Sequence, residues 1–310
     1  MSTMLGEVFY WLFNMSLVAS VGGLIVLALR ALPRLPCRFA CWLWIVPLFR
    51  MWIPIGMGSR WSLMTLISKL TTRTVVVWER GDMSFAMSNM IMAANSYFPV
   101  TYRINLLEGL FRTVAMIWLA VAVAILITMA VLYVTTKREL RDAIHMRENV
   151  YLSDKVTSPA LYGILRPRII LPSGWESRED LALILAHENA HARHLDNLWR
   201  VLAFVTAALH WFNPLAWVFL RVSLSDMELY CDERVLKRLD DTDKKAYALA
   251  LVNSAQSARE KTLFASAFGG AKIRVRIDRI LNYRRLSAIS ATCFAVLVLA
   301  IAYILLTNAK

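Results

Sequence analysis

Three uncharged apolar runs, at residues 8–29, 114–134 and 286–307, most constrain the fold of this chain. A helix needs about 20 consecutive apolar residues to cross a bilayer, and each run is that long. With 58% hydrophobic residues and a mean hydropathy of +0.50, the chain is too apolar for a soluble globular protein. A weaker run at residues 39–58 contains Arg50, whose long side chain can reach the membrane surface. The sequence therefore predicts a mainly α, polytopic membrane protein with four transmembrane helices.

Basic residues lie at one end of the apolar runs, and they predict the orientation of the chain. They are Arg30, Arg34 and Arg38 after the run at 8–29, Lys137, Arg138 and Arg141 after the run at 114–134, and Lys272, Arg274, Arg276, Arg279, Arg284 and Arg285 before the run at 286–307. Because positive flanks stay in the cytoplasm, the N-terminus is expected outside. This bias also accounts for the formal charge of +13, so no direct nucleic-acid binding is expected.

The predicted organisation has three parts. Residues 1–134 hold three transmembrane helices with an outer loop near 59–106, and residues 135–285 form a cytoplasmic domain. Residues 286–310 hold the fourth transmembrane helix and a short external tail. The four cysteines include no Cys-x-x-Cys pair, so they predict neither a structural zinc site nor a disulfide.

The stretch LALILAHENAHARHL, residues 181–195, contains a metal-binding pattern. Ser177 and Asp180 resemble a capping box, which predicts a helix that begins just after them. On that helix His187 and His191 are one turn apart, so both imidazoles can reach one zinc ion, and Glu188 can take a proton from bound water. The pattern is typical of zinc peptidases; the alternative is a structural helix that carries surface histidines.

The third zinc ligand is expected in SLSDMELYCDERVLKRL. Glu228 would complete a His-His-Glu site, and Asp232, one helical turn later, would orient a ligand imidazole through a hydrogen bond. The alternative is a solvated acidic face that pairs with Arg234 or Lys237. His194 lies too far along the helix from His187 to share its metal ion.

Residues 201–220 are uncharged and almost long enough to cross a bilayer. If they crossed it, Glu228 would lie on the opposite side from His187 and His191. We therefore predict that Asn213-Pro214 breaks this stretch into a membrane-dipping hairpin that returns to the side from which it entered.

Two segments before the histidine helix, NVYLSDKV and ALYGILRPRIILP, are predicted to be β-strands, because they are rich in β-branched and aromatic residues and bounded by Gly and Pro. Together with the helices, they make the predicted cytoplasmic domain α+β. A strand edge beside a zinc cleft can hold an extended peptide by main-chain pairing. A purely structural hairpin is the alternative.

Four motifs in order, SPALYGILRPRIILP, HENAHARHLDNLWR, LHWFNPLAW and MELYCDERVL, resemble the BlaR/MecR-type antirepressor membrane zinc metalloproteases. The resemblance implies a gluzincin-like cytoplasmic domain with one Zn²⁺ per chain. By motif match, His187, His191 and Glu228 are the ligands, Glu188 is the general base and Asp232 supports a ligand. His210 or Tyr230 is the candidate to stabilise the oxyanion, and the sequence does not choose between them.

The resemblance also implies a function in the bacterial plasma membrane: cleavage of a winged-helix-type transcriptional repressor, in signalling for β-lactam or cell-envelope stress resistance. Expected partners are the repressor, the lipid bilayer, a separate sensor protein and a second copy in a homodimer. The family's C-terminal penicillin-binding sensor is expected to be lacking, because no Ser-x-x-Lys motif occurs. Self-cleavage within residues 260–271 is a further expectation. The alternatives are a membrane quality-control zinc protease and a non-catalytic signalling scaffold.

Overall fold

The computed structural model describes residues 2–31, 35–53, 59, 61–62, 65, 105–259, 273–283 and 287–307. Most of the predicted outer loop near 59–106 and the candidate self-cleavage segment at 260–271 lie outside these residues.

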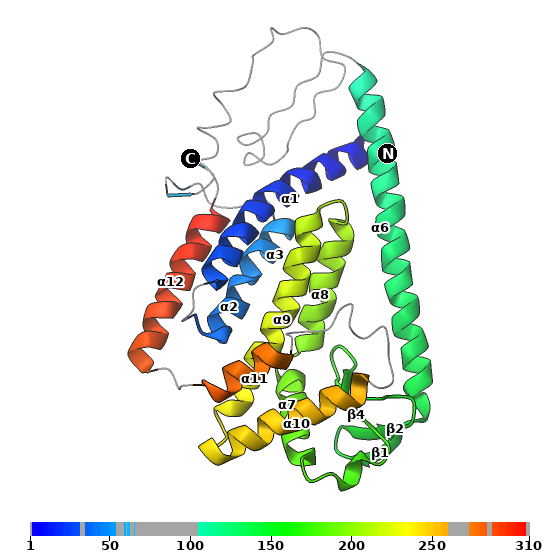
Figure 1. Ribbon diagram of the computed structural model, residues 1–310. Coiled ribbons are helices and arrows are strands. Elements are labelled where there is room, and N and C mark those ends of the chain that lie inside the picture. The colour runs from blue at the N-terminus through cyan, green and yellow to red at the C-terminus, as the bar shows by residue number, and fades with distance from the viewer. Residues whose placement is uncertain are drawn as a thin grey trace.

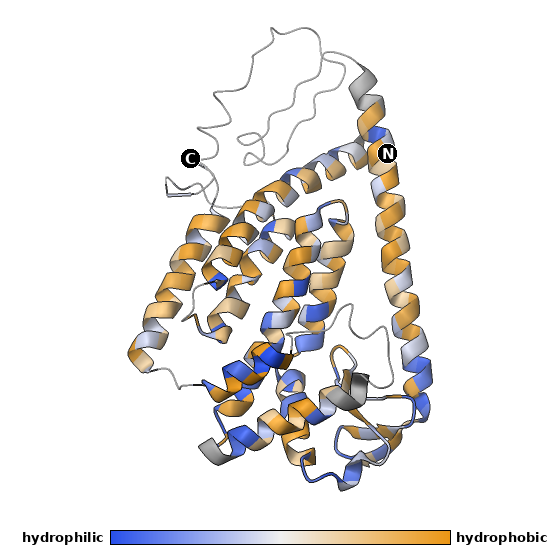
Figure 2. Cartoon of the chain, in the orientation of Figure 1, coloured by the Kyte–Doolittle hydropathy of each residue, from blue (hydrophilic) through white to orange (hydrophobic). Residues whose placement is uncertain are grey.

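Among the described residues, three helices are long and apolar enough to span a membrane. They are α1 (Ser2–Arg30), α6 (Asn105–Glu139) and α12 (Ala288–Leu306), and hydrophobic residues predominate along each of them (Figure 2). The helical prediction for the three uncharged runs is confirmed. The weaker run instead forms two short helices, α2 (Cys37–Leu43) and α3 (Ile45–Trp52). A fourth transmembrane helix therefore stays a prediction.

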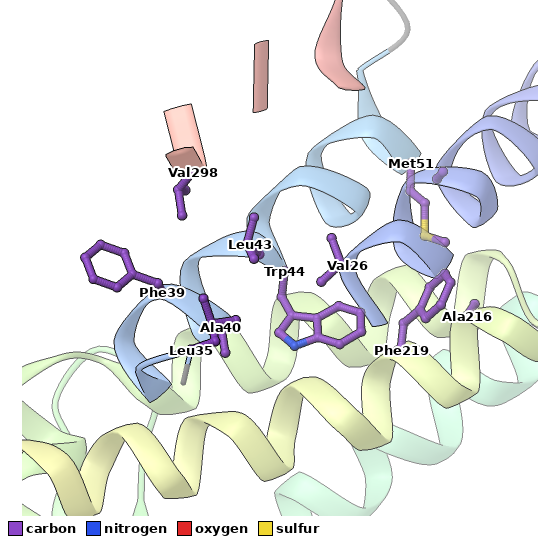
Figure 3. Packing of buried hydrophobic residues seen from close by; sticks show 11 residues of the cluster. Val26, Leu35, Phe39, Ala40, Leu43, Trp44, Met51, Ala216, Phe219 and Val298 are labelled. Carbon is purple, nitrogen blue, oxygen red and sulfur yellow. The ribbon is translucent and has the colours of Figure 1, made fainter. Parts of the chain in front are cut away.

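The largest cluster of buried apolar side chains joins four of these helices to α9 (Pro214–Leu236). Figure 3 shows its centre, where Trp44, from the junction of α2 and α3, lies near Val26 of α1 and Phe219 of α9. A Cβ atom at Gly23 of α1 would overlap the Phe219 ring, so glycine permits the close approach of α1 and α9.

A four-stranded sheet follows α6, in the order β1 (Ile144–Arg147), β2 (Val150–Ser153), β4 (Arg168–Pro172), β3 (Ala160–Tyr162). The strand predictions are thus confirmed. β2 pairs with β4 in parallel, whereas β1 and β3 pair antiparallel at the two edges. Buried side chains of β2 and β4 pack against α7 (Leu181–Arg193), which fixes the histidine helix beside edge strand β3.

The capping-box prediction for α7 is wrong. The helix begins after Asp180, but no side chain caps it, because the Asp180 carboxylate binds the Arg178 guanidinium at 2.7 Å. Ser177 belongs to a preceding 3-10 turn, and its hydroxyl group donates to the Gly174 carbonyl. Asp180 thus forms an ion pair with Arg178, two residues earlier, in place of the expected capping contact with backbone N–H groups at the start of α7.

The hairpin prediction is confirmed in its geometry. Residues 201–220 do not form one helix, because α8 (Asp196–Leu209) ends before Asn213 and α9 begins at Pro214. The Asn213 side chain caps α9 by accepting from the Leu215 N–H at 2.9 Å. Figure 1 shows α8 and α9 side by side in antiparallel directions. The second helix thus brings Glu228 back to α7, while insertion of the hairpin into a bilayer stays a prediction.

Two further helices, α10 (Asp241–Arg259) and α11 (Ile273–Leu281), cover the end of the molecule that contains α7 (Figure 1). Tyr247 of α10 and Ile280 of α11 are fully buried against Val235 and Leu236 of α9. This packing directs polar residues of both helices toward the histidines.

Candidate metal centre

The two histidines of the HENAH segment lie on the buried face of α7. His187 is 7% and His191 2% exposed, and their Nε2 atoms are 3.3 Å apart. The i, i+4 spacing produces this pairing, since residues four apart share one face of a helix. Two buried imidazoles therefore direct their Nε2 atoms at one point.

Glu228 of α9 lies across from the histidine pair. Its two carboxylate oxygens are 3.7 Å from His187 Nε2 and 3.6 Å from His191 Nε2. The alternative of a solvated acidic face does not fit this position, because Glu228 is largely buried and binds Arg200 at 2.7 Å and Arg276 at 3.5 Å. Two imidazole nitrogens and one carboxylate thus form a set of the kind that holds catalytic zinc.

The Nδ1 atom of each imidazole, on the opposite side of the ring from Nε2, contacts a polar side chain. His191 Nδ1 lies 2.7 Å from the Asp196 carboxylate. The Tyr247 hydroxyl donates to Asp232 at 2.7 Å, and its oxygen lies 2.8 Å from His187 Nδ1, where it can accept. These contacts favour protons on both Nδ1 atoms, so that the Nε2 atoms are the metal-binding nitrogens. Arg276 Nη2 also approaches this point and lies 3.3 Å from His187 Nε2. The donor set therefore fits a metal.

Arg276 of α11 fixes Asp232 in turn. Its Nε and Nη2 atoms each donate to one Asp232 oxygen at 2.8 Å, in a bidentate ion pair. Burial alone would raise the pKa of Asp232, but the Arg276 guanidinium outweighs it and lowers that pKa to about 2. Asp232 is therefore ionised at neutral pH, and both of its oxygens can accept hydrogen bonds.

Cys231 is a second candidate for the third ligand, and sequence reasoning missed it. One ligand atom each from His187, His191 and Cys231 lie within 4.8 Å of one another. However, the thiol lies 3.6 Å from His187 Nδ1 and 3.4 Å from its carbonyl oxygen, so it faces the back of that ring. We favour Glu228, because it faces both Nε2 atoms.

A cavity of about 480 Å³ opens onto this cluster. Its wall includes His187, Glu188, His191 and Glu228, whereas Cys231 does not line it. The other walls come from edge strand β3, through Ala160 and Leu161, and from Arg200, Ser254 and Arg276. A metal ion held at Nε2 would thus keep a position open toward this space, as catalysis requires.

The two candidates for oxyanion stabilisation lie elsewhere. Neither His210 nor Tyr230 lines the cavity with the histidine pair. His210 is 1% exposed at the far end of α8, and the Tyr230 ring lies under the Arg234 guanidinium, 3.9 Å from its centroid. The cationic groups that the structure does bring to the cavity are Arg200 and Arg276.

Sequence reasoning also missed Asp196, Tyr247, Arg200 and Arg276. Asp196 follows His191 by five residues, and the left-handed backbone of Leu195, with φ 53°, turns the chain so that this carboxylate faces back to α7. Tyr247 and Arg276 come from α10 and α11, and no local pattern links them to the HENAH segment. Only the tertiary packing identifies them.

Comparison with known proteins places these residues in a family. A family model described as BlaR1 peptidase M56 matches residues 10–280, which include the histidine pair, Glu228 and Arg276. The chain belongs to the M56 peptidase family. It is 31% identical to the regulatory protein BlaR1 of Bacillus licheniformis over 162 residues, 50% of this chain and 27% of that protein.

Two staphylococcal proteins are similar to shorter parts of the chain. The methicillin resistance protein mecR1 of Staphylococcus aureus is 25% identical over 103 residues, 32% of this chain and 18% of that protein. The regulatory protein BlaR1 of Staphylococcus aureus is 24% identical over 137 residues, 43% of this chain and 23% of that protein. The chain thus spans only about a quarter of the length of these relatives.

Proposed function

We propose that this chain is a membrane-embedded zinc metallopeptidase that cleaves a cytoplasmic transcriptional repressor, in signalling related to β-lactam or cell-envelope stress resistance. Family membership supports the peptidase activity, and the names of its relatives, a regulatory protein and a methicillin resistance protein, support the regulatory role. The observation that carries the proposal is the convergence of His187 Nε2, His191 Nε2 and Glu228 at the floor of an open cavity.

His187, His191 and Glu228 would hold one zinc ion, with Asp196, Tyr247 and Asp232 keeping the imidazoles in place. When bound, zinc lowers the pKa of a coordinated water to near neutrality and polarises a carbonyl group. Glu188 lies between the two histidines in sequence, is half-buried and lines the cavity. Its carboxylate would take the proton from the attacking water and pass it to the leaving amine.

The edge strand β3 would hold the substrate. Asn197 donates to the Leu161 carbonyl at 2.9 Å and to the Gly163 carbonyl at 3.0 Å, so the Leu161 carbonyl faces away from β4. In a β-strand the N–H group of a residue points to the same side as its carbonyl, so the Leu161 N–H lies at the free edge. An extended peptide can pair there beside the histidines with little dependence on its side chains.

Arg200 and Arg276 are the groups that we propose to stabilise the oxyanion, in place of His210 and Tyr230. Their guanidinium nitrogens lie 2.7 and 3.5 Å from the Glu228 carboxylate, at the wall of the same cavity. Fixed cations beside the point where negative charge develops stabilise a transition state without reorganisation.

A Glu188→Gln substitution tests the function. It keeps the shape of the side chain and removes the base, so turnover should fall roughly 100-fold or more while bound zinc is retained. The readout is the amount of a co-encoded winged-helix repressor in cells under β-lactam or envelope stress. Glu179→Gln, at an exposed position just before the same helix, is the matched control and should cleave like the unchanged chain.

Two outcomes favour the alternatives. Loss of unrelated misfolded membrane proteins in a Glu188-dependent way, with the repressor intact, would indicate a quality-control protease. A chain that binds no zinc and still transmits the signal would indicate a scaffold.

A further inference from the structure

A second cavity, of about 360 Å³, lies along the α8–α9 hairpin and is separate in its lining from the histidine site. It runs between α3, α8 and α9, from Ala216 near the hairpin turn to Arg234 at the other end. These two residues are about 27 Å apart along α9 at 1.5 Å per residue. One leaflet with its headgroups is about 20–22 Å thick, so the cavity is long enough for a single lipid molecule.

The wall of this cavity is apolar over most of its length. It includes Trp44, Leu48, Met51, Phe219 and Leu220. The two hydroxyl groups in this stretch are already bonded to their own helices, Thr206 to the Leu202 carbonyl and Ser223 to the Leu220 carbonyl. The middle of the cavity thus suits an acyl chain better than a peptide, whose backbone would need polar partners.

Three large apolar residues at the rim connect the cavity with its surroundings. Trp42, Ile45 and Trp199 line it and are 44%, 43% and 41% exposed, so a large part of each is left uncovered by the other described residues. In a membrane-embedded hairpin such a rim faces lipid, and tryptophan is the residue enriched where acyl chains meet headgroups.

The polar end of the cavity is cationic. Arg234, His194 and Asp196 line it. Arg193 directly precedes His194 at the end of α7, and Arg238 follows Arg234 by four residues, in the turn that ends α9. Asp196 is paired with Arg234 at 3.1 Å, whereas Arg193 and Arg238 are exposed and have no ion pair among the described residues. The net positive charge at this end complements a phosphate group.

We propose that this cavity binds one anionic phospholipid, with an acyl chain between α3, α8 and α9 and its phosphate at Arg193, His194, Arg234 and Arg238. Asp196 pairs with Arg234 at this end of the cavity and also accepts from His191 Nδ1. Asp196 would therefore be the residue between the bound headgroup and the metal centre. The site is independent of peptide cleavage, so lipid binding can be tested without substrate.

The test is native mass spectrometry of the delipidated full chain, titrated with phosphatidylglycerol or phosphatidylcholine that carry identical acyl chains. We expect one retained phosphatidylglycerol per chain, bound roughly 10-fold more tightly than phosphatidylcholine, because the cations favour the net negative headgroup. Equal retention of the two lipids by the unchanged chain would overturn the proposal without any variant.

Substitutions locate the site. Ala203→Trp fills the cavity from α8 and should abolish the retained lipid. Val218→Trp is the matched control, because Val218 precedes cavity residue Phe219, is 43% exposed and does not line the cavity. The double change Arg193→Gln and Arg238→Gln should reduce phosphatidylglycerol binding to the phosphatidylcholine level.

Circular dichroism and gel filtration verify that each variant is folded. Lipid retention that is the same in folded Ala203→Trp and Val218→Trp chains contradicts the assignment. If Ala203→Trp instead removes a dimer and leaves lipid binding unchanged, the cavity face is an interface between copies, and the lipid proposal is also wrong.

Discussion

The two ends of the α8–α9 hairpin are held by different chemistry. At the end next to α7, carboxylates bind histidines and arginines: Asp196 contacts His191, and Glu228 contacts Arg200. At the turn, Asn213 donates to the Ser16 and Ser20 hydroxyls of α1 at 2.7 and 2.8 Å, with no charged group involved.

Aromatic packing completes the attachment of the turn. Phe9 of α1 and Trp118 of α6 form a buried cluster beside Trp211 and Phe212, and the Trp118 indole donates to the Leu209 carbonyl at 2.7 Å. A neutral, aromatic contact suits a site inside a membrane, where an unpaired charge is costly. The proposed metal site thus lies at the base of the hairpin, whereas the turn attaches the hairpin to α1 and α6, so changes at the two ends should affect different properties.

The largest effect is expected at the base, where Glu228→Ala removes a proposed metal ligand. Zinc affinity should fall by more than roughly 100-fold. Loss of a residue that only hydrogen-bonds to a ligand typically lowers metal affinity by about 10- to 100-fold, and loss of a ligand itself should cost more. Cys231→Ala is the discriminating partner, because the two residues are alternatives for the same role. Metal analysis after dialysis at graded free zinc measures both. If Cys231→Ala loses the metal and Glu228→Ala keeps it, the ligand assignment is reversed.

A smaller effect at the base is expected from Asp196→Asn. The amide keeps the volume but weakens the hold on His191 Nδ1, so zinc affinity should fall roughly 10- to 100-fold. Asp154→Asn, an exposed aspartate in the turn after β2, is the control and should leave zinc binding unchanged. Equal zinc affinity for both variants would show that Asp196 does not support the centre.

The base was the more predictable end from the sequence. His187, Glu188 and His191 follow a fixed spacing on one helix, and the need for Glu228 to lie on the same side as that pair required a hairpin broken at Asn213-Pro214. Helical periodicity and the backbone limits of proline act locally, so a single sequence displays them.

Contacts between distant segments were not predictable in the same way. Arg276 reaches Asp232 across 44 residues and Tyr247 reaches His187 across 60. Tyr230 is close to Glu228 in sequence, yet its ring lies in the wall of the second cavity. The break between α2 and α3 at Trp44 has a local cause, because Pro47 has no N–H group to donate to the Leu43 carbonyl. The packing of the Trp44 ring between α1 and α9, by contrast, is a long-range contact.

The smallest effect is expected at the turn of the hairpin, from Asn213→Ala. The change removes the cap of α9 and both bonds to α1, which should lower the free energy of unfolding by about 2 kcal/mol. Zinc bound per folded chain should not change, because Asn213 caps the start of α9 and lies about 22 Å along the helix from Glu228, at 1.5 Å per residue. Asn282→Ala is the control, because it removes an amide side chain at an exposed position after α11 and should leave the free energy of unfolding nearly unchanged. Thermal unfolding in detergent, followed with and without added zinc, measures both properties. If Asn213→Ala lowers zinc affinity as strongly as Asp196→Asn, the two ends do not act separately and the division of the hairpin is wrong.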